Sequence, residues 1–443
     1  MTHDPLSAYD LVHDEIAQRR ETGYDVDGAA QLLAAADPDD GDALSTLYRE
    51  VCSAPRTAGW AYHEPDTLRE IIDVLPAASM AGPTHDLSES ALADHVRGGW
   101  LGRIAGCNLG KPVEDGDHWT AGHLKDYLVR AGAYPLRDYI PVLDPMPAEF
   151  VMRENWPRTT RGNVQGSDRD DDIDFSILAL HLLERHGSGL APHHVASAWL
   201  RLLPFLQVFT AERAAYRNLI HGVPLADVAR TRNPYREWIG AQIRADAFGW
   251  VNPGNPRAAA ILAYQDASLS HVGNGIYGEM WAAALVATAF TAEGPRDALL
   301  TSLSHIPPDT RLAEALRDVL RLHSDGNTWE QALGHIQERY GHYGWVHTVN
   351  NAAAVAAGLL WGDGDYTDTV GLTVQAGWDT DSNGATAGSV AGVLLGAEAL
   401  PDHFIAPLED RTRSALFGFD HARISELAAR TTRLAANGLR PEA

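Results

Sequence analysis

The sequence has few cysteines and no long apolar run. Cys52 and Cys107 are the only cysteines among 443 residues, so we expect neither a disulfide framework nor a zinc site built from thiolates. The most apolar stretches, residues 352–361 and 385–400, are too short or too rich in glycine and alanine to cross a bilayer, which needs about 20 apolar residues. Residues 1–5 lack the basic region and apolar run of a signal peptide. We therefore expect a soluble, cytoplasmic protein without membrane contact.

Basic residues are also scarce relative to acidic ones. Lys and Arg number 35 against 59 Asp and Glu, which gives a net charge of −24. Sequence-independent binding to nucleic acid or to an anionic membrane needs clustered Lys and Arg, so we do not expect either. A small phosphorylated ligand is compatible with this composition, because backbone N–H groups and a few arginines suffice to bind it. The oligomeric state is left open.

Sustained β-type alternation and successive β-branched runs are absent as well. Apolar residues recur at helical spacing instead, so we predict an all-α fold. Residues 1–90 contain several helical pieces separated by breakers, which predicts a helical extension that packs on the main domain or on a partner. Residues 91–443 form the predicted main domain. Within it, residues 115–165 are rich in Pro, Tyr, Asp and Trp without periodicity, which predicts a long irregular insertion or lid.

Acidic and hydroxyl side chains concentrate at residues 377–388. Asp379, Asp381 and Ser382 stand there, before a run of small residues that is typical of a tightly packed helix. Carboxylates at a helix start are either a cap or a cation site. A cap needs one side-chain oxygen, whereas this segment offers three, the hard ligands that Mg²⁺, Ca²⁺ or Mn²⁺ prefer. Because Asp-rich turns are common, both interpretations stay open for this segment alone.

A second acidic cluster occurs far from the first in the sequence. Asp170, Asp171 and Asp172 stand directly before an apolar helix that is predicted to end near residue 186. Three consecutive carboxylates exceed what a helix dipole favours, and their mutual repulsion destabilises the helix start unless cations neutralise it. Two acidic helix starts that meet in one pocket have the geometry of a two-metal site. We therefore predict that the tertiary structure joins the two clusters.

Glycines recur every four residues in front of a further carboxylate. Gly102, Gly106 and Gly110 lie on one stripe if residues 95–110 are helical, and such a stripe lets another backbone approach closely. The stretch ends in a Lys-Pro-Val-Glu sequence, whose last residue is Glu114. Glu114 is either a solvated loop residue or, because it follows a buried glycine-faced helix, a site residue.

Two more segments combine glycines with a polar group in front of an apolar helix. They are residues 239–249, which include Arg244, and residues 270–279, which include His271. Taken alone, Arg244 is more often paired within a protein, and His271 is more often structural. Their interpretation therefore depends on the remaining motifs.

Together these motifs resemble the ADP-ribosylglycohydrolase family, which includes the dinitrogenase reductase-activating glycohydrolases and the ADP-ribosyl-arginine and ADP-ribosyl-serine hydrolases. The likeness runs in the family's order from about residue 94 to about residue 400. It rests on the glycine-rich helix that ends at Glu114, the acidic residues 170–172, residues 243–249, the Ser-His pair at 270–271 and residues 377–382. One such motif is weak, but the ordered set is specific.

The resemblance implies a compact all-α glycohydrolase domain with two Mg²⁺ or Mn²⁺ ions. Asp381 would bridge the ions, and Glu114, Asp171 or Asp172 would act as the base. The implied metal ligands, all at the two acidic helix starts, are Asp170, Asp171, Asp172, Asp379, Asp381 and Ser382. The residues implied to contact the substrate are Arg244, Gly249, His271, Gly273, Asn274 and Gly275.

Three positions depart from the family pattern. The family usually has Thr where Asp170 stands, and Ile173 replaces a second Thr. Asp170 is still a competent oxygen ligand, but its extra negative charge is expected to alter the metal preference. Ile239 stands where many members carry Asn in a Gly-Asn-Gly loop near the ligand, so the resemblance does not give the identity of the substrate.

The expected function is hydrolysis of the C1″ glycosidic bond of an ADP-ribosyl or ribosyl conjugate. The metals would orient the ribose 2″- and 3″-hydroxyls and supply an activated water. Nearby carboxylates would stabilise the oxocarbenium-like sugar as the bond breaks.

Three alternatives stay open. In the first alternative, the substrate is an N-riboside or nucleotide-like small molecule instead of an ADP-ribosylated protein. Asp170, Asp171 and Asp174 also fit the diphosphate-binding pattern of all-α isoprenoid synthases, although the Asp-Thr-Asp cluster in a glycine-rich context does not. Lastly, the chain is an inactive ADP-ribose-binding or structural member of the family, against which the intact acidic sets argue.

Overall fold

The computed structural model describes residues 7–77 and 85–440. It is 62% helical, and the prediction of an all-α fold is confirmed. The described ranges contain only two short strands, β1 (Arg411–Thr412) and β2 (Ala422–Arg423), which pair antiparallel. In these same ranges, no helix is both long and apolar enough to cross a bilayer.

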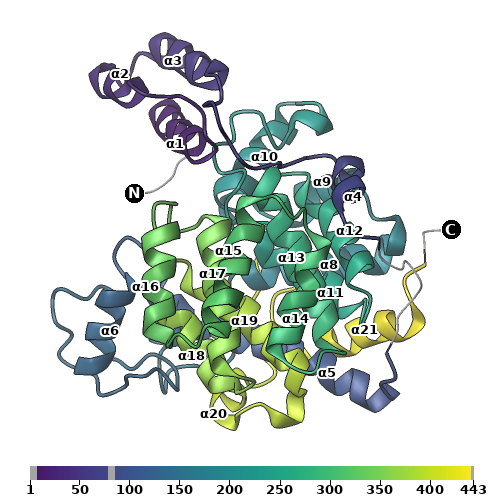
Figure 1. The fold of residues 1–443 in the computed structure, drawn as a ribbon. Coiled ribbons are helices and arrows are strands. Elements are labelled where there is room, and N and C mark those ends of the chain that lie inside the picture. Colours follow the sequence, from purple (N-terminus) through teal and green to yellow (C-terminus); the bar gives the residue numbers. More distant parts are fainter. Residues whose placement is uncertain (1–6, 78–84, 441–443) are drawn as a thin grey trace.

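The first three helices form an N-terminal lobe at the edge of the molecule, drawn in purple at the top of Figure 1. Residues such as Val12, Leu44 and Val51 give this lobe a small apolar core of its own. The lobe is therefore held together by local contacts. The helices of the N-terminal part are α1 (Ala8–Glu21), α2 (Ala29–Ala35), α3 (Gly41–Ser53) and, beyond the lobe, α4 (Leu68–Val74).

The rest of the chain packs around one large core. At its centre lie α13 (Gly273–Ala289), α17 (Thr348–Gly362) and α19 (Thr380–Leu395), whose residues are almost all buried. A helix that is buried on all sides must be apolar or small all round, and these three are rich in Ala, Gly, Val and Leu. They form the frame on which the other helices pack.

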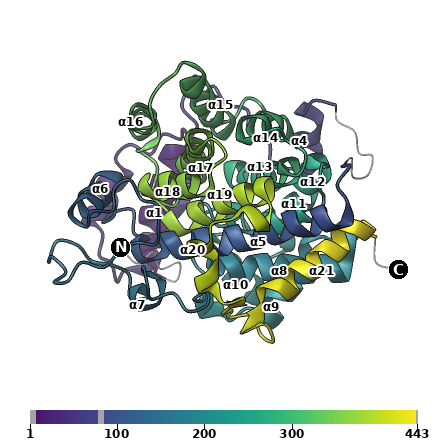
Figure 2. The same ribbon diagram turned by 90° about the horizontal axis from the view of Figure 1, so that it is seen from below.

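The remaining helices of this main body surround that frame (Figures 1 and 2). The α-helices are α5 (Glu89–Gly110), α8 (Asp171–His186), α9 (Pro192–Leu202), α10 (Thr210–Ile220), α11 (Asp246–Trp250), α12 (Pro256–Ala267), α14 (Pro295–Ser302), α15 (Arg311–Ser324), α16 (Trp329–Tyr340), α18 (Tyr366–Gln375), α20 (Asp402–Ile405) and α21 (Ile424–Asn437). The short 3-10 helices are η1 (Lys111–Val113), η2 (Gly187–Gly189), η3 (Phe205–Gln207), η4 (Leu225–Asp227), η5 (Gln242–Arg244), η6 (Leu303–His305), η7 (Ala397–Ala399) and η8 (Ala406–Leu408).

Helices α5 and α19 lie side by side in opposite directions (Figure 2). A Cβ atom added at Gly102 would lie 2.1 Å from the carbonyl oxygen of Gly388, and one added at Gly106 would lie 2.0 Å from that of Gly384. The predicted glycine stripe and its close backbone contact are therefore confirmed. Because the helices are antiparallel, the end of α5 lies beside the start of α19.

The segment 115–165 is less irregular than its sequence indicates. It contains α6 (Ala121–Arg130) and the short α7 (Trp156–Thr159), so the prediction of an irregular insertion is wrong over these residues. The reason is that α6 has apolar residues at helical spacing, among them Leu124 and Leu128, and buries them against the body. The rest of the segment has no helix or strand.

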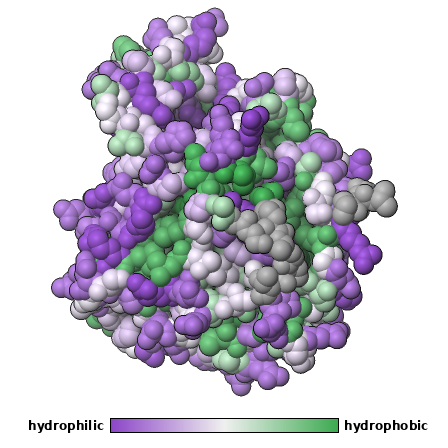
Figure 3. All heavy atoms as spheres, turned by 45° about the vertical axis from the view of Figure 1, so that its right-hand side comes forward, coloured by the Kyte–Doolittle hydropathy of each residue, from purple (hydrophilic) through white to green (hydrophobic). Residues whose placement is uncertain are grey.

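One face of the molecule shows how hydrophilic and apolar residues are distributed at its surface. On the face shown in Figure 3, hydrophilic residues surround separate apolar patches, and the N-terminal lobe at the top is largely hydrophilic. This distribution agrees with the large negative net charge of the chain.

Candidate functional site

The two acidic helix starts lie against each other in the fold. Asp170 is the N-cap of α8, and its Oδ1 accepts a hydrogen bond from the backbone N–H of Asp172 at 2.9 Å. Ser382, in the first turn of α19, donates from Oγ to Oδ2 of Asp172 at 3.1 Å. Tertiary structure thus joins side chains that are 210 positions apart in the sequence.

The turn before α19 directs Asp379 into this cluster. Gly377 and Trp378 have φ angles of 78° and 59°, in the left-handed region that a bulky side chain rarely adopts. Asp379 follows at the N-cap position and is 6% exposed, yet its side chain makes no capping hydrogen bond. The carboxylate of Asp379 is therefore not a helix cap, and the turn directly before it has a strained backbone.

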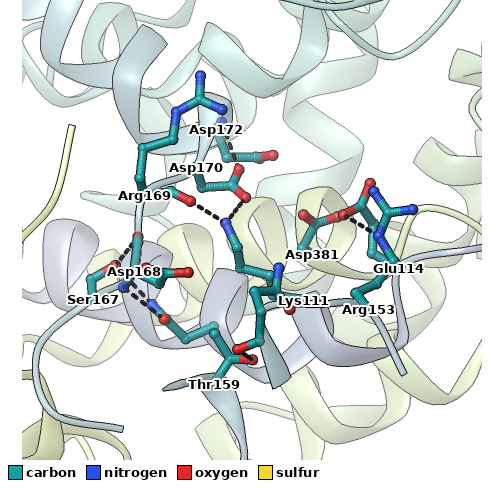
Figure 4. Close-up of polar contacts among 12 residues, drawn as sticks. Lys111, Glu114, Arg153, Thr159, Ser167, Asp168, Arg169, Asp170, Asp172 and Asp381 are labelled. Carbon is teal, nitrogen blue, oxygen red and sulfur yellow. Dashed lines mark hydrogen bonds and ion pairs between the residues drawn. The ribbon is translucent and has the colours of Figure 1, made fainter. Parts of the chain in front are cut away.

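The end of α5 brings a third segment to the same place. Thr380 donates from Oγ1 to the carbonyl oxygen of Gly110 at 2.9 Å, and the chain continues through η1 to Glu114. The side chain of Lys111 is 6% exposed, whereas that of Glu114 is 23% exposed. In Figure 4, Asp381 lies between Lys111 and Glu114.

Two groups of side chains in this centre have potential ligand atoms that lie within 4.8 Å of one another. The first group is Glu114, Asp379 and Asp381, and the second is Cys107, Asp170 and Asp381. The first group consists of carboxylates, the donors that Mg²⁺ and Mn²⁺ prefer. The second includes a buried thiol, and one of its carboxylates already has a cationic partner within the protein. The first group therefore fits a hard cation better than the second.

Burial and mutual repulsion act on the carboxyls of the first group. Burial, with the negative charge of Asp170 next, raises the pKa of Asp381 to about 6. Burial and then the charge of Asp381 raise the pKa values of Asp379 and Glu114 well above the usual range. A bound cation stabilises the ionised form of such carboxylates, so it would relieve this repulsion.

Asp170 has the opposite electrostatic environment. Lys111 donates from Nζ to the Asp170 carboxylate and to the carbonyl oxygen of Arg169. Burial opposes ionisation of Asp170, but the ammonium of Lys111 outweighs it and lowers the pKa of this carboxyl. Burial likewise lowers the pKa of Lys111, but the negative charge of Asp170 outweighs the effect of burial, so the pKa of the lysine is raised. The two residues form a buried ion pair.

A comparison with protein families identifies the chain. A family model described as ADP-ribosylglycohydrolase matches residues 88–439. The chain belongs to the ADP-ribosylglycohydrolase family. This family is in general one of glycohydrolases. The match begins after α4, so the N-terminal lobe lies outside the matched residues.

Comparisons with individual proteins add less about this chain. A solved structure described as an ADP-ribosylglycohydrolase-related protein complex is similar, with a TM-score of 0.47 and 19% sequence identity. The similarity covers 78% of this chain and 99% of that one. No curated protein sequence matches the chain.

Asp172 is one of the three carboxylates predicted as the base, and both of its oxygens have partners within the protein. Its Oδ1 accepts a hydrogen bond from Nη2 of Arg103 at 3.2 Å, and its Oδ2 accepts the one from Ser382. The residue is 2% exposed. Since both oxygens are bonded within the protein, Asp172 orients its neighbours, and its role as the base stays a prediction. Asp171 and Glu114 are only half-buried and keep the predicted role.

Sequence reasoning missed three basic residues of the centre. Arg103 is fully buried and also donates from Nη1 to Asp246 at 2.8 Å. Lys111 pairs with an acidic residue, and Arg153 places Nε 3.7 Å from Oε2 of Glu114. The available signal was the position of Arg103 and Lys111 on or directly after the glycine stripe, where a charged side chain cannot avoid burial.

Arg244 lies in a buried ionic network and not at the acidic centre. It donates from Nη1 to Glu212 at 2.6 Å and from Nη2 to Ser270 at 2.9 Å, and it also pairs with Asp266. His271 joins this network through its Nδ1, 2.8 Å from the Ser270 hydroxyl. Both side chains are buried and have protein partners. Arg244 and His271 therefore have structural partners within the protein, and their predicted substrate contacts stay a prediction.

Asn274 also has its polar groups bonded within the protein. Its side-chain amide donates to Glu64 at 2.8 Å and to Glu237 at 2.9 Å, and its Oδ1 accepts from the backbone N–H of Leu312 at 3.0 Å. Asn274 therefore fastens the segment that follows the lobe to the body, and its predicted substrate contact stays a prediction.

The three glycines predicted near the substrate serve packing. A Cβ atom added at Gly249 would lie 2.6 Å from Cβ of Val286, and Gly275 is similarly crowded. Gly273 has a φ of 48°, and its N–H donates to Asp66 at 2.7 Å. Neighbouring protein atoms account for these glycines, and their predicted ligand contacts stay a prediction.

Proposed function

We propose that this protein is a metal-dependent glycohydrolase that cleaves the C1″ glycosidic bond of an ADP-ribosyl or ribosyl conjugate. Membership of the family supports the reaction class. The metal dependence is supported by the convergence of Glu114, Asp379 and Asp381 within 4.8 Å, which is the observation that carries the proposal. The uncapped position of Asp379 adds to it, because this buried carboxylate has no role in starting its helix.

The residues of the centre would have different roles in the reaction. Glu114, Asp379 and Asp381 would hold Mg²⁺ or Mn²⁺, which when bound would supply orientation of the ribose hydroxyls and a water activated near neutral pH. Glu114 and Asp171 have half-buried side chains, so either is able to accept the proton of an attacking water. The negative charge of the cluster would stabilise the positive charge that grows on the ribose as the bond breaks.

The replacement Asp379→Asn tests this proposal. It removes a charged oxygen donor and should lower Mg²⁺-dependent release of ADP-ribose or ribose at least about 100-fold, in line with the loss of a directly acting group. Asp365→Asn is the matched control. Asp365 is the N-cap of α18, and Asn caps a helix as well as Asp does, so this variant should keep full activity.

The choice of substrate separates the alternatives. Wild-type protein is assayed with Mg²⁺ against ADP-ribosylated proteins and against free ADP-ribosyl compounds and N-ribosides. Release only from the small molecules would indicate a metabolic glycohydrolase. Absence of any release, together with a rise in Tm on adding ADP-ribose, would indicate an inactive binding protein and contradict the proposal. Full activity of the Asp379→Asn variant would contradict the assigned metal site.

A further inference from the structure

We infer that the acidic centre binds one divalent ion, at Glu114, Asp379 and Asp381, and that the ammonium group of Lys111 serves as a built-in cation in the place of a second ion. This inference rests on the proposed function, since it concerns the same centre. It replaces the expectation of two ions drawn from the sequence.

The position of Lys111 is fixed by its surroundings. The residue directly follows Gly110, which packs so closely on α19 that an added Cβ atom would lie 2.1 Å from the carbonyl oxygen of Thr380. Its side chain is only 6% exposed. The ammonium group ends at the Asp170 carboxylate and the Arg169 carbonyl, as Figure 4 shows. The cation is therefore part of the folded centre.

The ammonium group lies where the second donor group would have to act. That group is Cys107, Asp170 and Asp381, and the carboxylates of two of its members, Asp170 first and then Asp381, stabilise the ammonium. A divalent ion at Asp170 would face the positive charge of Lys111 across a few ångströms in a buried site, where repulsion is strong. The ion and the ammonium group are therefore alternatives.

The first donor group, Glu114, Asp379 and Asp381, has no such buried cation among the described residues. Its basic neighbour is Arg153, with Nε 3.7 Å from Oε2 of Glu114, and the Arg153 side chain is 48% exposed. An exposed arginine is able to move aside or stay near without entering the group. Asp381, which belongs to both groups, then has Lys111 on one side and the ion site on the other (Figure 4).

The metal stoichiometry tests the inference directly. Wild-type protein, stripped with a chelator, is titrated with Mn²⁺ alone by isothermal calorimetry, and bound Mn²⁺ is measured by electron paramagnetic resonance. We expect one ion per chain with the spectrum of an isolated ion. Two ions per chain with spin coupling would overturn the inference and leave the proposed function standing. No bound ion would instead contradict the metal site of the proposed function.

Two variants locate the single ion. Asp379→Asn should abolish Mn²⁺ binding, whereas Asp170→Asn should retain one ion with less than a tenfold change in Kd. One ion that is lost in Asp170→Asn and kept in Asp379→Asn would overturn the inference.

A third variant tests whether the lysine excludes a second ion. Lys111→Met removes the ammonium group but keeps its bulk, so a folded variant should bind a second Mn²⁺ at Asp170. A folded Lys111→Met variant that still binds one ion would show that the lysine does not exclude the second, and would likewise overturn the inference.

Discussion

Residues of one type have different pKa values in this protein because their surroundings differ. Lys111 keeps the pKa of Asp170 low, while burial and neighbouring carboxylates raise that of Asp381 to about 6. Histidines show the same dependence on surroundings. Burial, followed by the positive charge of Arg257, lowers the pKa of His305 to about 4. Its Nδ1 lies 3.1 Å from Nε of Arg257, a donor, so the ring is held as a neutral acceptor.

His305 is expected to make the fold sensitive to acid. The unfolded chain takes up this proton near pH 6.5, and the folded chain only near pH 4. The contribution of neutral His305 to the free energy of unfolding is therefore fully present above pH 6.5. About 3 kcal/mol of it is lost as the pH falls to 4. In His305→Gln, the free energy of unfolding, measured in urea, should fall less steeply over this range. The exposed His403→Gln should behave like wild type, and equal slopes in all three proteins would refute the assignment.

The contact between α5 and α19 is the element that builds the centre. Reciprocal glycines let the two backbones touch, and the antiparallel arrangement sets Gly110 against Thr380. Lys111 and Glu114 on one chain segment thereby reach Asp381 on the other. A local property of the sequence, a glycine every four residues, thus determines the geometry of a site formed by distant residues.

Substitution within this stripe should disturb both stability and the site. Gly102→Ala places a methyl group against the Gly388 carbonyl, a backbone atom that cannot turn away, and should cost about 2 kcal/mol or more and weaken Mn²⁺ binding. Gly334→Ala is the control, because Gly334 lies in α16 with no atom near its added Cβ. It should raise stability by about 0.5–1 kcal/mol. Thermal unfolding and calorimetry measure both effects, and similar behaviour of the two variants would contradict the role of the stripe.

At the scale of the whole molecule, buried polar contacts join the N-terminal part to the body. Gln18 of α1 donates to Glu237 at 2.8 Å. Arg311, at the start of α15, pairs with Glu237 at 2.6 Å and with Glu64 at 2.9 Å. Burial opposes ionisation of Glu237, but Arg311 outweighs it and lowers its pKa. A few charged groups therefore join two apolar cores that are otherwise separate.

Removing Arg311 should loosen this attachment. Arg311→Gln leaves two buried carboxylates without their cation and should cost about 3–5 kcal/mol, with faster hydrogen exchange in α1 and α3. Arg321→Gln is the control on the same helix, since its side chain is 52% exposed and its ion pairs are worth less than about 1 kcal/mol. Equal loss of stability in the two variants would show that the buried network does not fasten the lobe.

Local patterns in the sequence were enough to predict the all-α fold, the glycine stripe and the acidic helix starts. Helical periodicity, a breaker or a glycine every fourth residue depends on neighbours along the chain, and the structure preserves each of them. The same reasoning failed for α6, because Pro, Tyr and Asp around it hid the apolar spacing of Leu124 and Leu128.

Only the tertiary structure decided what each polar side chain does. Lys111 donates a hydrogen bond to Asp170, and Asn274 donates one to Glu64. Asp172 accepts hydrogen bonds from both Arg103 and Ser382. Each of these partners lies far away in the sequence, and a buried charge takes whichever opposite charge or donor the packing of helices presents. The sequence by itself therefore determined which carboxylates stand at helix starts, and the packing of α5, α8 and α19 determined which of them converge and which of them pair with basic side chains.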